Sequence, residues 1–153
     1  MIEGVTLKPL ITHSDERGYF RELIRVTDDF FSEGFGQWSE SLMYQDVCKA
    51  WHIHALQVDW WRVVFGTIKV VLYDVRSDKP IYDSATYEEI EEFILDNQTG
   101  ILRIPPGVAH GCKVLQGPAM LMYITSKVYN SEDEGRISYD ALDYDWLRGP
   151  EIK

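Results

Sequence analysis

Two of the four histidines stand on alternate residues of an extended run, at His52 and His54. In a β-strand, residues i and i+2 point to the same face, so both imidazoles can enter one cavity if this strand lines one. A third histidine, His110, follows a Pro-Pro-Gly turn at the end of another apolar strand. Histidines on rigid strands can act as general bases or bind metals, and the residues alone leave both chemistries open.

Short extended runs separated by turn residues surround these histidines and indicate an all-β fold, either a β-sandwich or a small barrel. The run 87–95 also fits helical spacing, but its short length within an all-β pattern favours a strand. A short helix is expected at 27–31, with Thr27 or Asp28 as its N-cap. The sequence is expected to form one domain, 1–153, with a single core. The expected strands are 5–8, 19–25, 37–45, 49–54, 60–65, 67–73, 87–95, 100–104 and 120–124.

Composition and charge exclude several classes of function. The net charge of −10 and the absence of any basic run argue against a nucleic-acid partner. No segment approaches the roughly 18 apolar residues of a membrane span, and the N-terminus lacks the pattern of a signal peptide. The two cysteines, Cys48 and Cys112, do not make a disulfide framework. These features predict a cytoplasmic protein with reduced thiols and no membrane partner.

Seven short motifs follow one another along nearly the whole chain. They are Asp15-Glu16-Arg17-Gly18-Tyr19-Phe20-Arg21-Glu22, Lys49-Ala50-Trp51-His52, Gln57 followed by Val63-Val64-Phe65-Gly66, Leu72–Arg76, Ile104–Gly111, the pair Tyr123 and Tyr129, and Tyr139–Trp146. In this order they resemble the dTDP-4-dehydrorhamnose 3,5-epimerases, the cupin-fold enzymes of deoxysugar biosynthesis. The resemblance implies a cupin-type double-stranded β-helix, that is, a jelly roll.

The resemblance also implies an isomerase that removes and returns a proton next to the ketone of a nucleotide-linked 4-keto-6-deoxy sugar. Such an epimerisation needs a base, an acid on the opposite face of the ring, and a group that stabilises the enolate. His52 matches the family's base and Tyr123 its acid, and Lys49 is the best candidate for the enolate stabiliser. The family works without a metal, and no cofactor is expected.

The nucleotide-diphosphate part of the substrate has its own expected contacts. The resemblance implies that Arg17 and Glu22 hold the diphosphate and the base region. In that family the counterpart of Arg17 reaches across a dimer interface, so a homodimer is expected. The expected substrate contacts are Arg17, Phe20, Glu22, Gln37, Gln57, His110 and Tyr129.

Four departures from the family pattern bear on the chemistry. Asp59 stands where the family has a lysine that helps polarise the substrate, and His54 stands where it has a glutamine. Lys49 replaces an arginine, which keeps the charge but loses the bidentate fork. The family's aspartate that pairs with the base lies in a Leu-Ser-x-Lys-Asp segment after the final tryptophan, and this sequence has no such segment. His54, Asp59 or His110 is therefore expected to orient His52.

Three other functions stay open. The dTDP-4-keto-6-deoxyglucose 3,4-ketoisomerases carry a His-x-His pair in which both histidines shuttle protons, as His52 and His54 could. A cupin metal set can be assembled from His52, His54, Asp59 and His110, although Asp59 is shorter than the glutamate that metal-binding cupins prefer. A non-catalytic sugar-nucleotide-binding module would explain the lost aspartate segment and lysine, but it has no need for a base and an acid.

Overall fold

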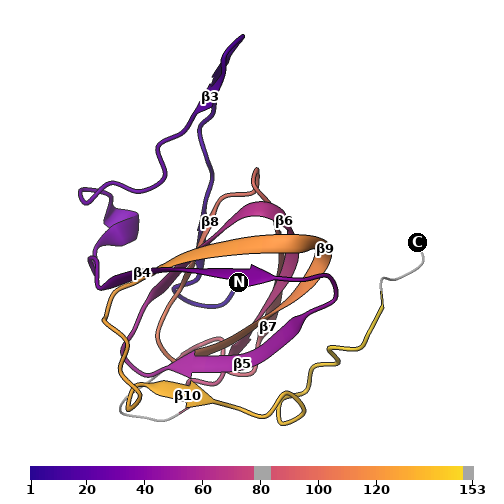
Figure 1. The fold of residues 1–153 in the computed structure, drawn as a ribbon. Helices are drawn as coiled ribbons and strands as arrows, with labels where there is room; N and C mark the ends of the chain where they lie inside the picture. Colours follow the sequence, from indigo (N-terminus) through magenta and orange to yellow (C-terminus); the bar gives the residue numbers. More distant parts are fainter. Residues whose placement is uncertain (78–83, 150–153) are drawn as a thin grey trace.

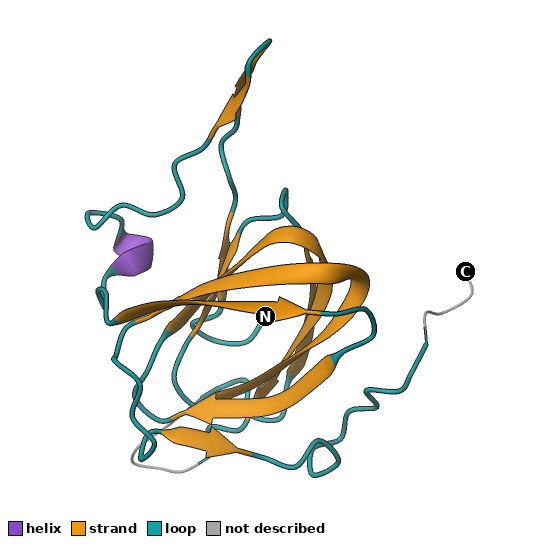
Figure 2. Ribbon diagram, in the orientation of Figure 1, coloured by secondary structure: helices purple, strands orange, loops and turns teal. Residues whose placement is uncertain are grey.

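The computed structural model describes residues 1–77 and 84–149, and its elements are strands apart from one turn of 3-10 helix (Figures 1 and 2). The all-β prediction is therefore confirmed. No helix in the described parts of the chain is long and apolar enough to cross a membrane. The elements are β1 (Thr6–Lys8), β2 (His13–Asp15), β3 (Gly18–Phe20), η1 (Asp29–Phe31), β4 (Gln37–Met43), β5 (Cys48–His54), β6 (Asp59–Asp74), β7 (Ile90–Leu95), β8 (Ile101–Ile104), β9 (Val108–Thr125) and β10 (Glu134–Arg136).

The long strands β6 and β9 form the spine of the main sheet. They pair antiparallel along nearly their whole length, and their register shifts between Val63 and Ile68. Gly66 lies within this irregular stretch at φ +77°, where a Cβ would come within 2.6 Å of the Ala119 backbone. A glycine is therefore required where the two strands bend past each other.

The remaining strands extend and close this sheet. Its order is β1-β8-β6-β9-β5-β10, with β4 added to β9 and β7 added to β6. Because β9 pairs with β6 along one side and with both β4 and β5 along the other, the sheet rolls around its own interior. The β2–β3 hairpin forms a separate two-stranded ribbon that projects away from the roll (Figure 1).

Alternation along the strands separates the inside of the roll from its outside. On β4 the odd residues are partly or fully buried, while Trp38, Glu40 and Leu42 face outward. The core contains Met43, Trp61 and Leu121, and these three side chains also line the main cavity. The apolar core therefore continues directly into the wall of that cavity.

A second apolar cluster fixes the orientation of β5. Trp51 is fully buried, and its ring lies 4.9 Å from the ring of Trp146 in the C-terminal segment. Because Trp51 points to this cluster, its neighbours at His52 and His54 point to the opposite face, toward the interior of the roll.

Several predicted elements differ from the structure. The expected strands 60–65 and 67–73 are one strand, β6, and the expected strand 120–124 is the end of the much longer β9. The expected strand 19–25 is wrong beyond Phe20, since residues 21–25 form no strand. The expected helix is a three-residue 3-10 turn without a side-chain cap, because the carboxylate of Asp28 accepts hydrogen bonds from the Lys8 ammonium and the Arg25 backbone instead.

Candidate active site

A cavity of about 400 Å³ lies inside the roll. Strands from both halves of the sheet and the segment leading into β10 contribute to its wall. Nine of the twelve residues expected at the site line it. The lining side chains include Gln37, Ser41, Met43, Lys49, His52, His54, Gln57, Asp59, Trp61, His110, Cys112, Leu121, Tyr123, Thr125, Tyr129, Asn130, Glu134 and Arg136.

A β-bulge brings Lys49 to the same face as the two histidines of β5. In the pairing of β5 with β9, Lys49 lies opposite Cys112 and His52 lies opposite His110. Ala50 and Trp51 on β5 thus lie opposite the single residue Gly111 on β9, and this extra residue reverses the alternation between Lys49 and His52. All three side chains consequently face the cavity, where the Lys49 ammonium donates a 2.9 Å hydrogen bond to the Ser41 hydroxyl.

His52, Glu134 and Arg136 form the more exposed part of the site, called here the outer group. The Nδ1 atom of His52 lies 3.5 Å from Oε1 of Glu134, and the side chains are 36% and 16% exposed. The same carboxylate oxygen lies 3.3 Å from Nη2 of Arg136. Burial lowers the pKa of His52 and the charge of Arg136 lowers it further, while the Glu134 carboxylate acts to raise it. His52 therefore keeps a neutral imidazole at neutral pH, with one ring nitrogen able to accept a proton, as a general base requires.

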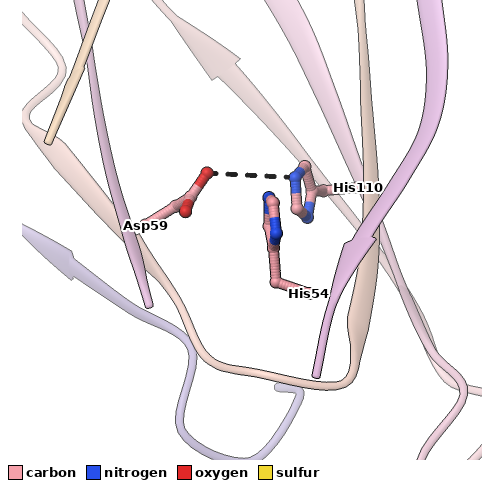
Figure 3. A group of neighbouring side chains, drawn as sticks. All are labelled: His54, Asp59 and His110. Atoms are coloured by element: carbon pink, nitrogen blue, oxygen red, sulfur yellow. Dashed lines mark ion pairs between the residues drawn. The ribbon is translucent and has the colours of Figure 1, made fainter. Parts of the chain in front are cut away.

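Asp59 and His110 (Figure 3), together with Gln57 and Trp61, form a buried group, called here the inner group. Asp59 accepts hydrogen bonds from the Gln57 amide at 2.8 Å and from the Trp61 indole at 3.1 Å. Nδ1 of His110 donates to the Val108 carbonyl at 3.1 Å, and its Nε2 lies 4.0 Å from Asp59. Burial lowers the pKa of His110 to about 4, against the opposing effect of the Asp59 charge.

His54 lies beside His110 of the inner group. Its ring centroid is 5.8 Å from that of His110, and its Nδ1 lies 3.9 Å from the Asp133 carboxylate. Asp133 also accepts a 2.8 Å hydrogen bond from the Leu56 backbone. Each histidine of the His-x-His pair thus has its Nδ1 side toward a carboxylate from the segment that forms β10.

Tyr123 faces the same cavity from β9, opposite Trp61 on β6 and Ser39 on β4. Tyr129 follows in the segment after β9, where its backbone N–H donates to the Gln37 side chain at 3.1 Å. An imidazole and a tyrosine side chain therefore line one cavity, and both are residue types that can transfer protons.

Three expected substrate contacts lie elsewhere in the chain. Arg17 and Phe20 sit on the projecting β2–β3 hairpin, and Glu22 follows it. Arg17 forms an ion pair with Asp15, and Glu22 forms one with Arg25. The structure thus keeps these side chains outside the cavity of their own chain.

Residues that could hold a metal form a smaller set than the sequence indicated. Within the described residues, one ligand atom from each of His54, Asp59 and His110 lies within 4.8 Å of the others (Figure 3). His52 does not belong to this group. Two histidines and one carboxylate can bind a divalent transition metal.

The fold and the cavity agree with comparisons to known proteins. The profile of the dTDP-4-dehydrorhamnose 3,5-epimerase family matches residues 1–152. The chain belongs to this family.

Two relatives and a solved structure extend the family match. The chain is 41% identical over 152 residues to the spore coat polysaccharide biosynthesis protein SpsL of Bacillus subtilis, covering 95% of this chain and 97% of that protein. It is 32% identical over 144 residues to the probable low-salt glycan biosynthesis epimerase Agl13 of Haloferax volcanii, covering 91% and 89%. The crystal structure of a dTDP sugar isomerase from Desulfovibrio desulfuricans superposes with a TM-score of 0.84 at 27% identity, covering 97% and 94%.

Family membership confirms the predicted cupin-type jelly roll and the predicted isomerase of the sugar-nucleotide epimerase type. The sequence alone did not identify Glu134, Arg136 or Asp133 as residues near the histidines. They belong to a polar stretch that carries no strand pattern, so the only available signal was the presence of several carboxylates after Tyr129.

Proposed function

We propose that the chain epimerises a nucleotide-linked 4-keto-6-deoxy sugar by removing and returning a proton next to the ketone. The observation that carries this proposal is the single cavity that His52, Lys49 and Tyr123 share. Family membership supports the same reaction class and a role in polysaccharide biosynthesis.

The proposed roles follow from the groups that face the cavity. His52 is the base: Nε2 takes the proton of the carbon next to the ketone, and the C–H electron pair moves into the enolate. Lys49 stabilises the charge on the enolate oxygen, which is where a fixed cation is most effective. Tyr123 returns a proton to the opposite face of that carbon. His52 then releases the proton it took to solvent, and solvent reprotonates the Tyr123 phenolate. Asp59 influences His52 through its charge, since its hydrogen bonds go to Gln57 and Trp61.

Substrate binding completes the proposal. Gln37, Gln57, Tyr129 and His110 contact the sugar nucleotide from within the cavity. Arg17, Phe20 and Glu22 contact its nucleotide part, and they do so in the cavity of a partner subunit because they lie outside their own. The reaction needs no bound cofactor, because base, acid and cation are all side chains.

A homodimer in the cytoplasm fits this arrangement. Large apolar side chains are exposed on the hairpin and on the outer face of β4, and such patches are typical of protein interfaces. They include Tyr19, Phe20, Trp38 and Leu42. Sedimentation velocity should give a dimer, and Trp38→Ser should shift it toward monomer. The free cysteines Cys48 and Cys112 fit a reducing compartment.

The test is incubation with 4-keto-6-deoxy sugars carried by dTDP, UDP, GDP or CDP in heavy water, followed by NMR. We expect deuterium at carbon 3, carbon 5 or both, together with an inverted product, and no exchange with His52→Ala. A carbonyl that moves from carbon 4 to carbon 3 would instead establish a ketoisomerase that uses His52 and His54. Saturable binding without exchange would establish a binding module.

A further inference from the structure

The short strand β10, which pairs with β5, places a carboxylate next to His52. In the antiparallel pairing of β10 with β5, Glu134 lies opposite His54 and Arg136 lies opposite His52. The Glu134 side chain reaches diagonally along β5, and its Oε1 atom approaches Nδ1 of His52 to 3.5 Å. Diagonal neighbours on one face of an antiparallel pair are within reach of long side chains.

We propose that Glu134 is a positioning residue that holds the imidazole of His52 in the orientation and tautomer needed for proton abstraction. This inference rests on the proposed epimerase function and adds a residue to it. Glu134 does not touch the reacting carbon; it acts through His52.

The tautomer follows from the chemistry of the two groups. An ionised carboxylate offers only acceptors, so the Nδ1 atom that faces it must carry the ring proton. The lone pair of the neutral imidazole is then on Nε2, the nitrogen on the other side of the ring. When Nε2 takes the proton from the sugar carbon, the ring becomes an imidazolium beside a negative charge that is already in place.

Glu134 is well placed to act on His52. Its side chain is 16% exposed, so its charge is screened less than that of a surface carboxylate. Nη2 of Arg136 lies 3.3 Å from the same oxygen, so the carboxylate has a cationic partner that helps to fix its position. Asp133, the next carboxylate along the chain, accepts from the Leu56 backbone and lies near His54 instead.

The electrostatic surroundings of His52 predict the direction of a pH effect. Burial and Arg136 lower the pKa of His52, and Glu134 opposes them. Glu134→Gln removes the opposing charge, so the pKa of His52 should fall further and the acidic limb of kcat/KM should move to lower pH. The titratable and charged groups that face His52 are Glu134 and Arg136 on β10, His54 on β5, Asp59 on β6 and His110 on β9.

The experiment compares Glu134→Gln, Glu134→Asp and the matched control Glu132→Gln, which changes an exposed glutamate of the same segment. In Glu134→Gln we expect kcat to fall about 10²-fold, KM to change less than twofold, and the acidic limb to shift as described. Glu134→Asp should recover part of kcat, and the control should match the parent protein. Thermal melting of all three variants verifies that each is folded.

A second readout does not depend on turnover. Long-range ¹⁵N–¹H NMR of histidine-labelled protein reports the tautomer of each ring. We expect His52 to carry its proton on Nδ1 in the parent protein and to become a mixture of tautomers in Glu134→Gln. An unchanged tautomer, or a kcat within threefold of the parent, would overturn the role of Glu134. If no sugar nucleotide is turned over, the proposed function fails, and the tautomer of His52 still decides whether Glu134 positions it.

Discussion

The outer and inner groups of the cavity each contain a histidine beside a carboxylate, and the two pairs lie in different environments. In the outer group the His52 side chain is 36% exposed, and its carboxylate partner also contacts Arg136. In the inner group the His110 side chain is 4% exposed, and Asp59 is held by neutral donors from Gln57 and Trp61. Both pairs bring an imidazole close to a carboxylate, but His52 is open to solvent and His110 is not.

In the proposed mechanism, this difference separates the histidine that reacts from the histidine that forms part of the cavity wall. Burial lowers the pKa of both rings, but only His110 is fully desolvated, with a pKa of about 4. His110 therefore stays neutral over the physiological pH range and forms a fixed part of the cavity wall. His52 can reach a ligand, and it can release the proton it accepts to water or to a second group.

The largest expected effect is at the outer histidine. His52→Asn removes the base, so turnover of the sugar nucleotide should fall by about 10³-fold or more. The melting temperature should change by only a few degrees, because the ring is not part of the apolar core. Steady-state kinetics and a thermal melt measure both quantities. Activity within tenfold of the parent protein would mean that another residue is the base. The outer and inner histidines would then not differ in reactivity as proposed.

The proposed acid should show a smaller and more specific effect. Tyr123→Phe keeps the ring in the cavity wall and removes the hydroxyl, so net inversion should fall about 10²-fold. His52 remains able to exchange the carbon-bound proton with solvent. The ratio of deuterium incorporation to inverted product should therefore rise, and NMR in heavy water measures it directly. A parallel loss of both would mean that Tyr123 acts in binding.

The sequence predicted the inner wall of the cavity better than its outer rim. The histidines, Asp59 and Tyr123 lie in strands whose alternation or short motifs mark them. Glu134 and Arg136 lie in a three-residue strand within a polar stretch, and only its pairing with β5 brings them to His52. Lys49 was identified by its motif, while simple alternation would have turned it away from His52, because the bulge between them is visible only in the pairing with β9.

Strand lengths show the same limit of local reasoning. Gly66 and the pair Gly117-Pro118 resemble strand ends in the sequence, yet β6 and β9 continue through them. These residues lie close together in the structure, where a side chain at position 66 would collide with the Pro118 carbonyl at 2.6 Å. These residues therefore mark a bend that the two strands share and not the end of either strand. The bend depends on contacts between segments far apart in the sequence, so a local pattern does not predict it.

The inner group should appear in the pH dependence of stability. The folded pKa of His110 is about 4, below the roughly 6.5 of an unfolded chain. Between these values the unfolded chain binds a proton that the folded chain does not, so stability should be full above about pH 6.5 and fall by up to a few kcal/mol toward pH 4. His110→Asn should flatten the slope of melting temperature between pH 6.5 and 5. His13→Asn, at an exposed histidine on the hairpin, should leave that slope unchanged.

The smallest expected effect concerns metal. His54, Asp59 and His110 offer a suitable donor set, but Nε2 of His110 lies 4.0 Å from the Asp59 carboxylate, whereas ligands around a tetrahedral zinc lie roughly 3.4 Å apart. Both oxygens of Asp59 already accept hydrogen bonds, from the Gln57 amide and the Trp61 indole. We therefore expect well under one metal ion per chain by elemental analysis and no change in melting temperature on adding EDTA. The opposite result would be one equivalent of co-purifying metal that the chelator removes, with a drop in melting temperature that His54→Gln reproduces. It would make His54, Asp59 and His110 a cation site, and the buried side of the cavity would then have a chemical role of its own.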